Sequence, residues 1–417
     1  MELLLALSAT ALGLALHLND GLYSPAAVGL LGLALLLCVG GVVGRFRTTD
    51  PTTLRIALAV LVIGQMVAMM LKRAGASEVT VPVVDQRPFQ IVVACAMALV
   101  LALAVAGRKT TVVCFVTLLA IHAAIGVWKL RTAPAPKIDV FIFQTDAPRA
   151  LMQGVNPYTI TFENIYGPDT RVYAPGVVQE GRLQFGYPYP PLTLLLTAPA
   201  QILFGDFRYA QLLAMLLIGV FIALIRPDSV GMLAAALLLF TPRCFYVLES
   251  GWTEPLSAML LAATVLCAVR FPRALPVALG LLLASKQYLP AAILLAWHGF
   301  PTQAAEGHGL ETRATIRLML IAVLVAVGVS LPLVLWNVDA FLHSAVTLQL
   351  RQPYRSDALS FLGWWGSSRP DWTGPFWVAF VALAIGVMLS WWRKPGFAAA
   401  FALSFLCFFA FNKQAFA

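Results

Sequence analysis

The segment KIDVFIFQTDAPRALMQGVNPY, residues 137–158, places a carboxylate close to the end of an apolar run. Asp139 follows the uncharged residues 110–128 closely and lies between two apolar neighbours. A carboxylate that loses water there holds its proton more tightly, so its pKa moves toward the range of a useful general base. On spacing alone the alternative is structural, with Asp139 capping a helix or pairing with Lys137.

Two further charges interrupt apolar segments in the second half of the chain. Lys286, in LLLASKQYLP, lies inside an otherwise uncharged segment. An ammonium at membrane depth is costly and indicates function by default. The alternative is a lysine whose long side chain reaches out to the lipid headgroups. Glu254, in ESGWTEPLSAMLL, lies between two short apolar runs, where the structural alternative is an acid at a helix N-terminus.

The residues after Asp139 predict a short amphipathic helix lying in the membrane interface. Thr145 or Asp146 is a suitable N-cap, Pro148 is tolerated in a first turn, and Gly154 is a natural stop. Helical spacing puts small and apolar side chains on one face and polar ones on the other, namely Ala147, Ala150 and Leu151 against Arg149 and Gln153.

The polar stretch after Asp139 ends in three prolines, at 188, 190 and 191 of FGYPYPPLTLLL. They favour an extended backbone before the next span and then the start of its helix. The two tyrosines beside them, Tyr187 and Tyr189, are expected at the depth of the membrane interface. An interfacial anchor accounts for the tyrosines, but it does not account for three prolines that fix their direction.

The composition requires a membrane to hold these segments. The chain is 60% hydrophobic and 11% charged, and uncharged runs recur throughout its length. Because a span needs about 20 apolar residues, the chain is predicted to be an all-α polytopic membrane protein with about 12–13 transmembrane or half-membrane helices. We expect the first span to be retained, because MELLLALSATALGLALHLND lacks the basic start of a cleaved signal. The net charge of +9 is scattered at span ends, which does not indicate nucleic acid.

Two polar segments, about 131–187 and 337–373, are too long for turns and are expected to be functional external loops. Five spans precede the first loop, at about 3–18, 24–43, 55–71, 89–106 and 111–129. Residues 1–109 are predicted to be a four-span scaffold and residues 110–417 the functional core. Within 206–299 the uncharged runs shorten around TPR, WTEP and SKQYLP, which indicates broken helices that line a polar cavity.

Orientation follows from the basic residues of short connectors. With a cytoplasmic N-terminus, most of them face inward: Arg45, Arg47, Arg55, Arg108, Lys109, Arg393 and Lys394. The 72–88 connector, with Lys72, Arg73 and Arg87, opposes this scheme. We expect a multi-pass protein of the bacterial cytoplasmic membrane whose site lies on the external side.

The order of these pieces resembles the GT-C superfamily of membrane glycosyltransferases. The resemblance covers roughly residues 110–417: an Asp soon after a span, then ALMQGVNPY, then YPYPPL leading into the next span, followed by FGDFRYAQ. The most similar branch uses polyprenyl-phosphate sugars and includes glycosyltransferase family 87 and the protein mannosyltransferases. Four spans precede the matching region, whereas in the family the catalytic loop commonly follows the first span.

The resemblance implies roles for the residues above. Asp139 would take a proton from an acceptor hydroxyl as that hydroxyl attacks the anomeric carbon of a hexose, with mannose among the donors that the resemblance implies. Cations would stabilise the departing polyprenyl phosphate, and the candidates are Lys286, Arg351 and Arg355. For the two arginines, in LQLRQPYRSDALS, the alternative is a surface pair with Asp357. Substrate-binding roles would fall on Glu254, Tyr189 and Tyr158.

Other classes fit less well. No D-x-D motif typical of nucleotide-sugar enzymes and no nucleotide-binding G-x-x-x-x-G-K-[ST] loop occurs. The six cysteines and five histidines are dispersed, so no metal site and no obligatory cofactor beyond the lipid-linked donor is predicted. The expected partners are membrane lipids, the donor and a glycan or glycolipid acceptor. The serious alternative is a transporter or flippase for a lipid-linked or amphipathic solute; a third is a scaffold whose tyrosine-rich loops bind a partner.

Overall fold

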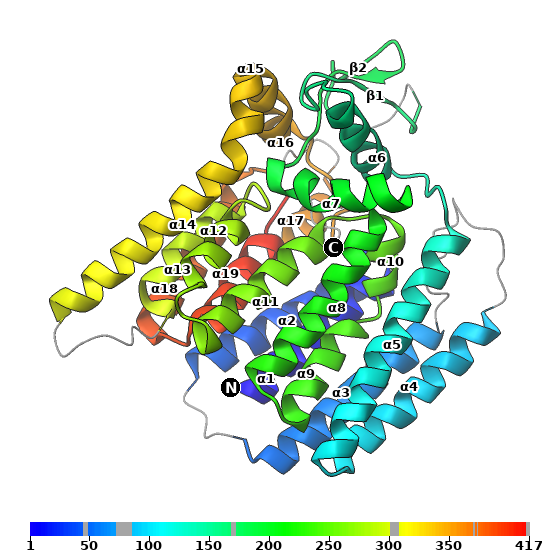
Figure 1. Ribbon diagram of the computed structural model, residues 1–417, viewed down its shortest axis with the longest axis vertical. Helices are drawn as coiled ribbons and strands as arrows, with labels where there is room; N and C mark the ends of the chain where they lie inside the picture. Colours follow the sequence, from blue (N-terminus) through cyan, green and yellow to red (C-terminus); the bar gives the residue numbers. More distant parts are fainter. Residues whose placement is uncertain are drawn as a thin grey trace.

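The computed structural model describes residues 1–44, 49–71, 86–167, 172–300, 308–369, 372 and 374–413 of the chain. The basic residues Arg45, Arg47, Lys72 and Arg73, which entered the orientation argument, lie outside these ranges. The described chain is built almost entirely of helices, and its two long polar segments lie together at one end of the molecule (Figure 1).

The first helices coincide with the five expected spans: α1 Glu2–Leu18, α2 Pro25–Val43, α3 Pro51–Leu71, α4 Arg87–Val105 and α5 Arg108–Thr132. Polar caps and prolines set their starts. Ser24 Oγ accepts a hydrogen bond from the Ala27 N–H (3.2 Å), and Asp50 Oδ2 accepts one from the Thr53 N–H (2.9 Å). Proline occupies the first turn of α2, α3 and α4, where its missing N–H costs nothing.

Several helices are long and apolar enough to cross a membrane, so the chain is a polytopic membrane protein. Among the described residues six helices meet this standard, in α2, α3, α4, α5, α8 (Arg208–Ile225) and α14 (His308–Trp336, from Thr312 onward). Shorter apolar helices accompany them, namely α1, α7 (Pro191–Phe204), α9 (Ser229–Leu239), α18 (Trp377–Arg393) and α19 (Phe397–Ala410). The larger total of about 12–13 therefore remains a prediction.

Residues 206–299 contain the predicted breaks. After α8 and α9 come α10 (Cys244–Glu249), α11 (Glu254–Arg270), α12 (Leu275–Leu283), the 3-10 turn η1 (Leu289–Ala292) and α13 (Ile293–Gly299). The chain interrupts its helices at TPR, at GWT and at SKQY, as the shortened apolar runs indicated. Each break brings polar side chains and free backbone groups to membrane depth, which requires a protein-lined cavity.

The first polar segment contains α6 (Asp139–Met152) and a small antiparallel sheet of β1 (Phe162–Glu163), β2 (Val178–Gln179) and β3 (Arg182–Leu183), in the order β1-β3-β2. The sequence predicted helices here but no sheet. Strands of two residues are too short to show an alternating pattern. Phe143 and Phe162 pack with ring centroids 4.7 Å apart, so a buried aromatic cluster joins the helix to the sheet.

The start of α6 differs from the prediction. The helix begins at Asp139 rather than at Thr145 or Asp146, and Pro148 lies inside it. An acid in the first turn is favoured by the helix dipole, and the helix continues through Pro148 although proline removes one of its backbone hydrogen bonds. The predicted faces are confirmed, because Ala147 is fully buried and Arg149 is exposed. Gly154, at φ +70°, follows the helix as expected.

The second polar segment packs against the first. It contains α15 (Val338–Phe341), the π-helix η2 (Leu342–Thr347), α16 (Leu348–Arg351) and α17 (Phe361–Gly366). Ser344 Oγ in η2 accepts a hydrogen bond from the Gly186 N–H at 2.8 Å and donates to the Tyr158 carbonyl at 3.3 Å. Gly186 is required at this contact, because a Cβ there would lie 2.2 Å from the Tyr158 carbonyl oxygen.

The first helices are not separate from the rest. Helix α3 packs on α9, and α2 packs on α18 and α19. The turn between α1 and α2 also joins the second polar segment: the Tyr23 N–H donates to the Asp357 carbonyl (2.7 Å), and Leu22 forms a bridge with Ala358. The predicted scaffold, residues 1–109, therefore reaches the polar end of the molecule.

Arg208 of FGDFRYAQ ties three elements together beneath this end. Its side chain is fully buried and pairs with Asp206 at 2.7 Å. Nη1 donates to the carbonyls of Ala133 (2.8 Å), just after α5, and Glu249 (2.9 Å), at the end of α10. The motif FGDFRYAQ, which is part of the family resemblance, therefore has a structural role in this chain.

Candidate functional site

A large cavity of about 1740 Å³ lies between the broken helices and the two polar segments. One side of it carries charged and aromatic polar residues, and the other is apolar. Of the predicted site residues, Asp139, Lys286, Glu254, Tyr189 and Arg355 all line it. Residues that lie far apart in the sequence therefore meet in one space.

Asp139 is held by two tyrosines. Tyr173 Oη donates to Asp139 Oδ2 at 2.6 Å, and Tyr166 Oη donates to Oδ1 at 3.3 Å. The Val140 N–H also donates to Oδ1, at 2.8 Å. Asp139 is thus the first residue of α6, as the capping alternative suggested, but its carboxylate also faces the cavity. Lys137, the other alternative partner, is exposed.

Burial raises the pKa of Asp139 above its ordinary value, and the hydrogen bonds from Tyr173, Val140 and Tyr166 lower it again in part. The raising effect is the larger one. Its physical cause is loss of water around the carboxylate, which disfavours the charged form. A carboxylate with a raised pKa, fixed by donors and facing a cavity, is suited to accept a proton from a bound hydroxyl.

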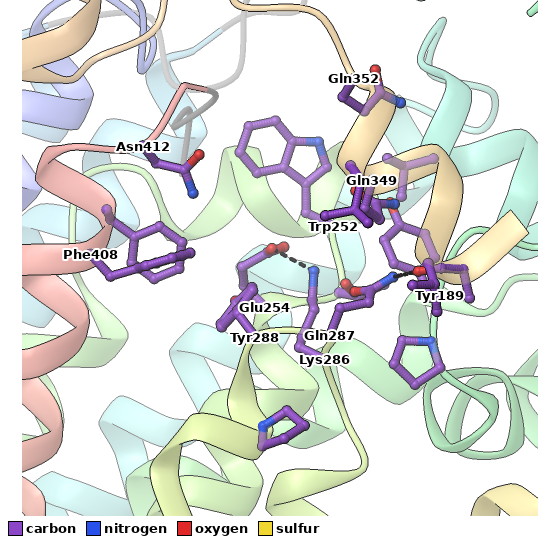
Figure 2. Close-up of a pocket in the computed structure, with 18 of the residues that line it drawn as sticks. Tyr189, Trp252, Glu254, Lys286, Gln287, Tyr288, Gln349, Gln352, Phe408 and Asn412 are labelled. Atoms are coloured by element: carbon purple, nitrogen blue, oxygen red, sulfur yellow. Dashed lines mark hydrogen bonds and ion pairs between the residues drawn. The ribbon is translucent and has the colours of Figure 1, made fainter. Parts of the chain in front are cut away.

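Lys286 and Glu254 form an ion pair on the same cavity. Lys286 Nζ lies 2.8 Å from Glu254 Oε1, and the side chains are 8% and 39% exposed. Figure 2 shows the pair with Trp252 beside it. Lys286 lies on the break between α12 and η1, and it does not reach outward to a membrane surface. Glu254 is the first residue of α11, so it is both a helix N-terminal acid and a cavity residue.

Three tyrosines, Tyr158 and the two of the YPYPPL motif, differ in whether they reach the cavity. Tyr189 lines the cavity, and its ring lies 5.0 Å from Lys286 Nζ. Tyr158 is buried behind it and donates from Oη to the Tyr189 carbonyl at 2.9 Å, so Tyr158 positions Tyr189. Tyr187 is fully buried and donates to Gln144 Oε1 at 3.1 Å. Tyr187 therefore packs inside the protein, and its depth at the membrane interface stays a prediction.

Prolines 190 and 191 act as predicted. Pro190 is extended, with φ −60° and ψ 153°, and Pro191 is the first residue of α7. Thr193 in the first turn of α7 donates to the Ser285 carbonyl at 2.9 Å, next to Lys286. The rigid approach to α7 therefore sets the position of the wall that carries the lysine.

The two candidate arginines of the second polar segment differ. Arg355 lines the cavity and pairs with Asp357, with Nε 2.7 Å from Oδ1. Burial is the largest single influence on the pKa of Asp357 and raises it. The hydrogen bond and the charge of Arg355, together with a backbone hydrogen bond, more than offset this and hold the pKa below its usual value. Arg351 is exposed at the end of α16 and is outside the set of described residues that line the cavity. The predicted pairing with Asp357 thus belongs to Arg355.

The apolar side of the cavity is formed by α14, α18 and α19. From α14 it includes Val323, Val327 and Leu331, and from the last two helices Phe380 and Phe408. Val327 and Leu331 are 49% and 42% exposed although they line the cavity. These apolar side chains therefore remain available for contact with a bound apolar group.

Sequence reasoning missed several residues of the polar side: Tyr166, Tyr173, Gln287, Trp252, Arg243 and Asp20. Tyr166 and Tyr173 had a usable signal, because both stand beside glycine or proline turns in the loop that follows Asp139. Gln287 is the neighbour of Lys286, and its Nε2 donates to the Pro188 carbonyl at 2.6 Å. The pairing of Asp20 with Arg243, 223 positions away, could not be predicted from any local pattern.

Within the part of the chain that the structure describes, no three His, Cys, Asp or Glu side chains are grouped so as to hold a metal ion. No protein-family model, curated protein or solved structure matches the chain.

Proposed function

We propose that this chain is an integral membrane glycosyltransferase that transfers a hexose from a polyprenyl phosphate to an acceptor hydroxyl. The observation that carries the proposal is the single cavity with two unlike sides. A tyrosine-held carboxylate and a lysine line one side, and apolar residues line the other. A substrate with a polar head and a long apolar chain would match both sides of the cavity.

Asp139 would act as the general base. The acceptor oxygen attacks the anomeric carbon, its proton passes to Asp139, and the bond between that carbon and the phosphate oxygen breaks with its electron pair on the phosphate. The raised pKa of Asp139, caused mainly by burial, makes its carboxylate a stronger proton acceptor than one in water.

Lys286 would stabilise the charge that develops on the leaving phosphate. One of its three N–H donors is used by Glu254, and the remainder can bind a phosphate oxygen. Glu254, 39% exposed on its side chain, would hold the ammonium in place, and would accept hydrogen bonds from the sugar hydroxyls. Arg355, on the same cavity, is a second cation for this role, whereas the position of Arg351 gives it no direct part.

The apolar side would hold the start of the lipid chain. Its residues between Val323 and Val334 of α14 extend for about 16 Å at 1.5 Å per residue. Exposed lining residues, among them Phe376 and Phe380, would let the chain continue into the bilayer.

An external site is supported by the distribution of basic residues. Arg226, at the end of α8, lies 3.6 Å from Glu2, and Arg270 donates to the Leu224 carbonyl. Arg108 begins α5, whose other end leads to the first polar segment. These arginines lie at the end of the molecule opposite the polar segments (Figure 1), which favours a cytoplasmic N-terminus.

The test is sugar transfer and sugar release by the purified protein in lipid nanodiscs, with labelled polyprenyl-phosphate hexoses, mannose first. Asp139→Asn should abolish transfer, because the amide keeps the shape and removes the base. The melting temperature checks that the variant is folded, because the amide has one acceptor oxygen and so cannot accept from both Tyr173 and Tyr166 as the carboxylate does. Transfer that survives in Asp139→Asn would contradict the proposed base.

The second candidate function is a transporter or flippase for a lipid-linked solute. The broken helices and the ion pair at the helix breaks favour it. Flux of a fluorescent lipid-linked sugar across proteoliposomes, with neither transfer nor release of sugar from any donor, would support this function over the enzyme.

A further inference from the structure

One part of the cavity has no role in the function proposed above. Asp20, Arg243, Tyr246 and Trp252, here named the rim cluster, all line the cavity. Asp20 comes from the turn between α1 and α2, Arg243 and Tyr246 from the start of α10, and Trp252 from the link between α10 and α11. The cluster therefore joins the N-terminal helices to the broken helices.

The cluster is built around a buried guanidinium. Arg243 is 4% exposed, and its Nη1 lies 3.3 Å from Asp20 Oδ1. The guanidinium carbon lies 4.1 Å from the centre of the Tyr246 ring and 5.7 Å from that of Trp252. The buried guanidinium is packed against two aromatic rings, and its charge-assisted contact orients the Asp20 carboxylate.

The Asp20 side chain also faces the cavity. It is 50% exposed although it is paired with a buried arginine. The Trp252 ring, set edge-on to Tyr246 with centroids 5.8 Å apart, stands on the same cavity. A fixed carboxylate beside aromatic rings is suited to a molecule that carries both hydroxyl groups and an apolar face.

The rim cluster, Asp139 and the Lys286–Glu254 pair line the same cavity. Trp252 of the cluster stands beside the Lys286–Glu254 pair (Figure 2). Tyr166, which donates to Asp139, and Tyr189, whose ring centre lies 5.0 Å from Lys286 Nζ, line this cavity too. The base, the ion pair and the cluster can therefore contact one set of bound molecules.

We propose that the rim cluster binds the acceptor, and that this acceptor is a neutral polyhydroxyl compound, a carbohydrate or a polyol. The inference rests on the proposed function, in which the region of Lys286 is taken by the donor phosphate. Asp20 accepts hydrogen bonds from acceptor hydroxyls, Trp252 packs against the apolar face of the ring, and a neighbouring hydroxyl is directed at Asp139. The cavity lining carries both signs of charge, but its cations Arg243, Lys286 and Arg355 are already paired with carboxylates, whereas Asp139 is held by tyrosine hydroxyls. An acceptor with an anionic group next to Asp139 is therefore disfavoured.

The first experiment measures binding without a donor. Methyl α-D-mannopyranoside, methyl α-D-glucopyranoside and myo-inositol are titrated against the full chain in nanodiscs by saturation-transfer NMR, with glucuronic acid as the anionic comparison. We expect at least one neutral probe to bind, and Asp20→Asn to weaken it by about tenfold, equivalent to about 1.4 kcal/mol. Asp50→Asn is the matched control, because Asp50 is an exposed helix cap far along the chain from the cluster and asparagine caps equally well.

Two outcomes overturn the inference. One is that no neutral probe binds to the parent protein, or that the glucuronic acid binds better. The other is that Glu254→Gln, rather than Asp20→Asn, removes the binding, which would place the probe on the donor side. If Asp20→Asn does not fold, Trp252→Leu is used in its place, since it leaves the Asp20–Arg243 pair intact; unchanged affinity in that variant also overturns the inference.

The second experiment separates this inference from the proposed function. Labelled polyprenyl-phosphate mannose is supplied with the probe, and both sugar transfer and sugar release to water are measured. Asp20→Asn should lower the ratio of transfer to release by about tenfold at low probe concentration, whereas equal losses of both would overturn the acceptor role. If the parent binds the probe through Asp20 but neither transfers nor releases sugar, the enzyme proposal fails while the binding site stands.

Discussion

Two lysine–glutamate pairs lie at opposite ends of the short stretch 249–254, and they differ in what surrounds them. Lys129 and Glu249 are 3.6 Å apart with side chains 6% and 5% exposed, and neither is among the described residues that line the cavity. Lys286 and Glu254 are 2.8 Å apart, with Glu254 39% exposed to the cavity. The same two residue types therefore support the fold in one place and present charge to a ligand in the other.

The closed pair should matter most for stability. Lys129→Met leaves Glu249 buried without its cation, which typically costs about 3–5 kcal/mol. We expect a clear fall in the thermal unfolding temperature in nanodiscs. Adding Glu249→Gln should restore part of the loss, because the remaining buried charge is removed. A melting temperature unchanged in Lys129→Met would mean that the two pairs do not differ in the way their burial suggests.

The open pair should matter most for activity. Lys286→Met should lower the transfer rate by about 10²–10³-fold, the usual effect of removing one donor from a developing oxyanion. Its melting temperature should fall less than that of Lys129→Met, because Glu254 keeps access to water in the cavity. Lys109→Met, an exposed lysine in the first turn of α5, serves as the control and should change neither quantity. Equal losses of stability in the two buried-lysine variants would remove the distinction.

The smallest expected effect is a shift in the pKa of Asp139. Tyr173 donates to the ionised form of Asp139 and so lowers its pKa, opposing the burial that raises it. Tyr173→Phe removes that donor, and the pKa of Asp139 should rise further. Because the base must be deprotonated, the acidic limb of the pH profile of kcat/KM should move to higher pH. Tyr166→Phe should move it less, since its contact is 3.3 Å rather than 2.6 Å; a larger shift in Tyr166→Phe would reverse the assigned order.

Local sequence patterns predicted what local chemistry determines. The lengths of the apolar runs predicted α1 to α5 and the breaks in 206–299, because membrane thickness sets the length of a span. Lys286 was predicted as a functional residue because an ammonium at that depth needs a partner, although the sequence did not identify Glu254 as that partner.

The remaining features depend on contacts between distant residues. The two-residue strands have no alternating pattern, and the inward turn of Tyr187 needs Gln144, 43 positions away, as its acceptor. The pairing of Asp20 with Arg243 spans 223 positions. No periodicity within one segment contains such information, which is why residues 1–109 were expected to be scaffold alone.

The π-helix η2 suggests how this cavity could change its selectivity in small steps. A π-turn contains one residue more than an α-turn, and here it precedes Gln349, which lines the cavity and donates to the Pro188 carbonyl at 3.2 Å. Deleting one residue within 342–347 would remove the extra residue and restore regular α-helix, while the residues that follow, Gln349 among them, would keep their facing. The side chains that the π-turn itself presents to the cavity, Ala345 and Val346, would be exchanged instead. A single codon lost or gained at this place would therefore alter the wall of the cavity without any change in Asp139, Lys286 or Gln349.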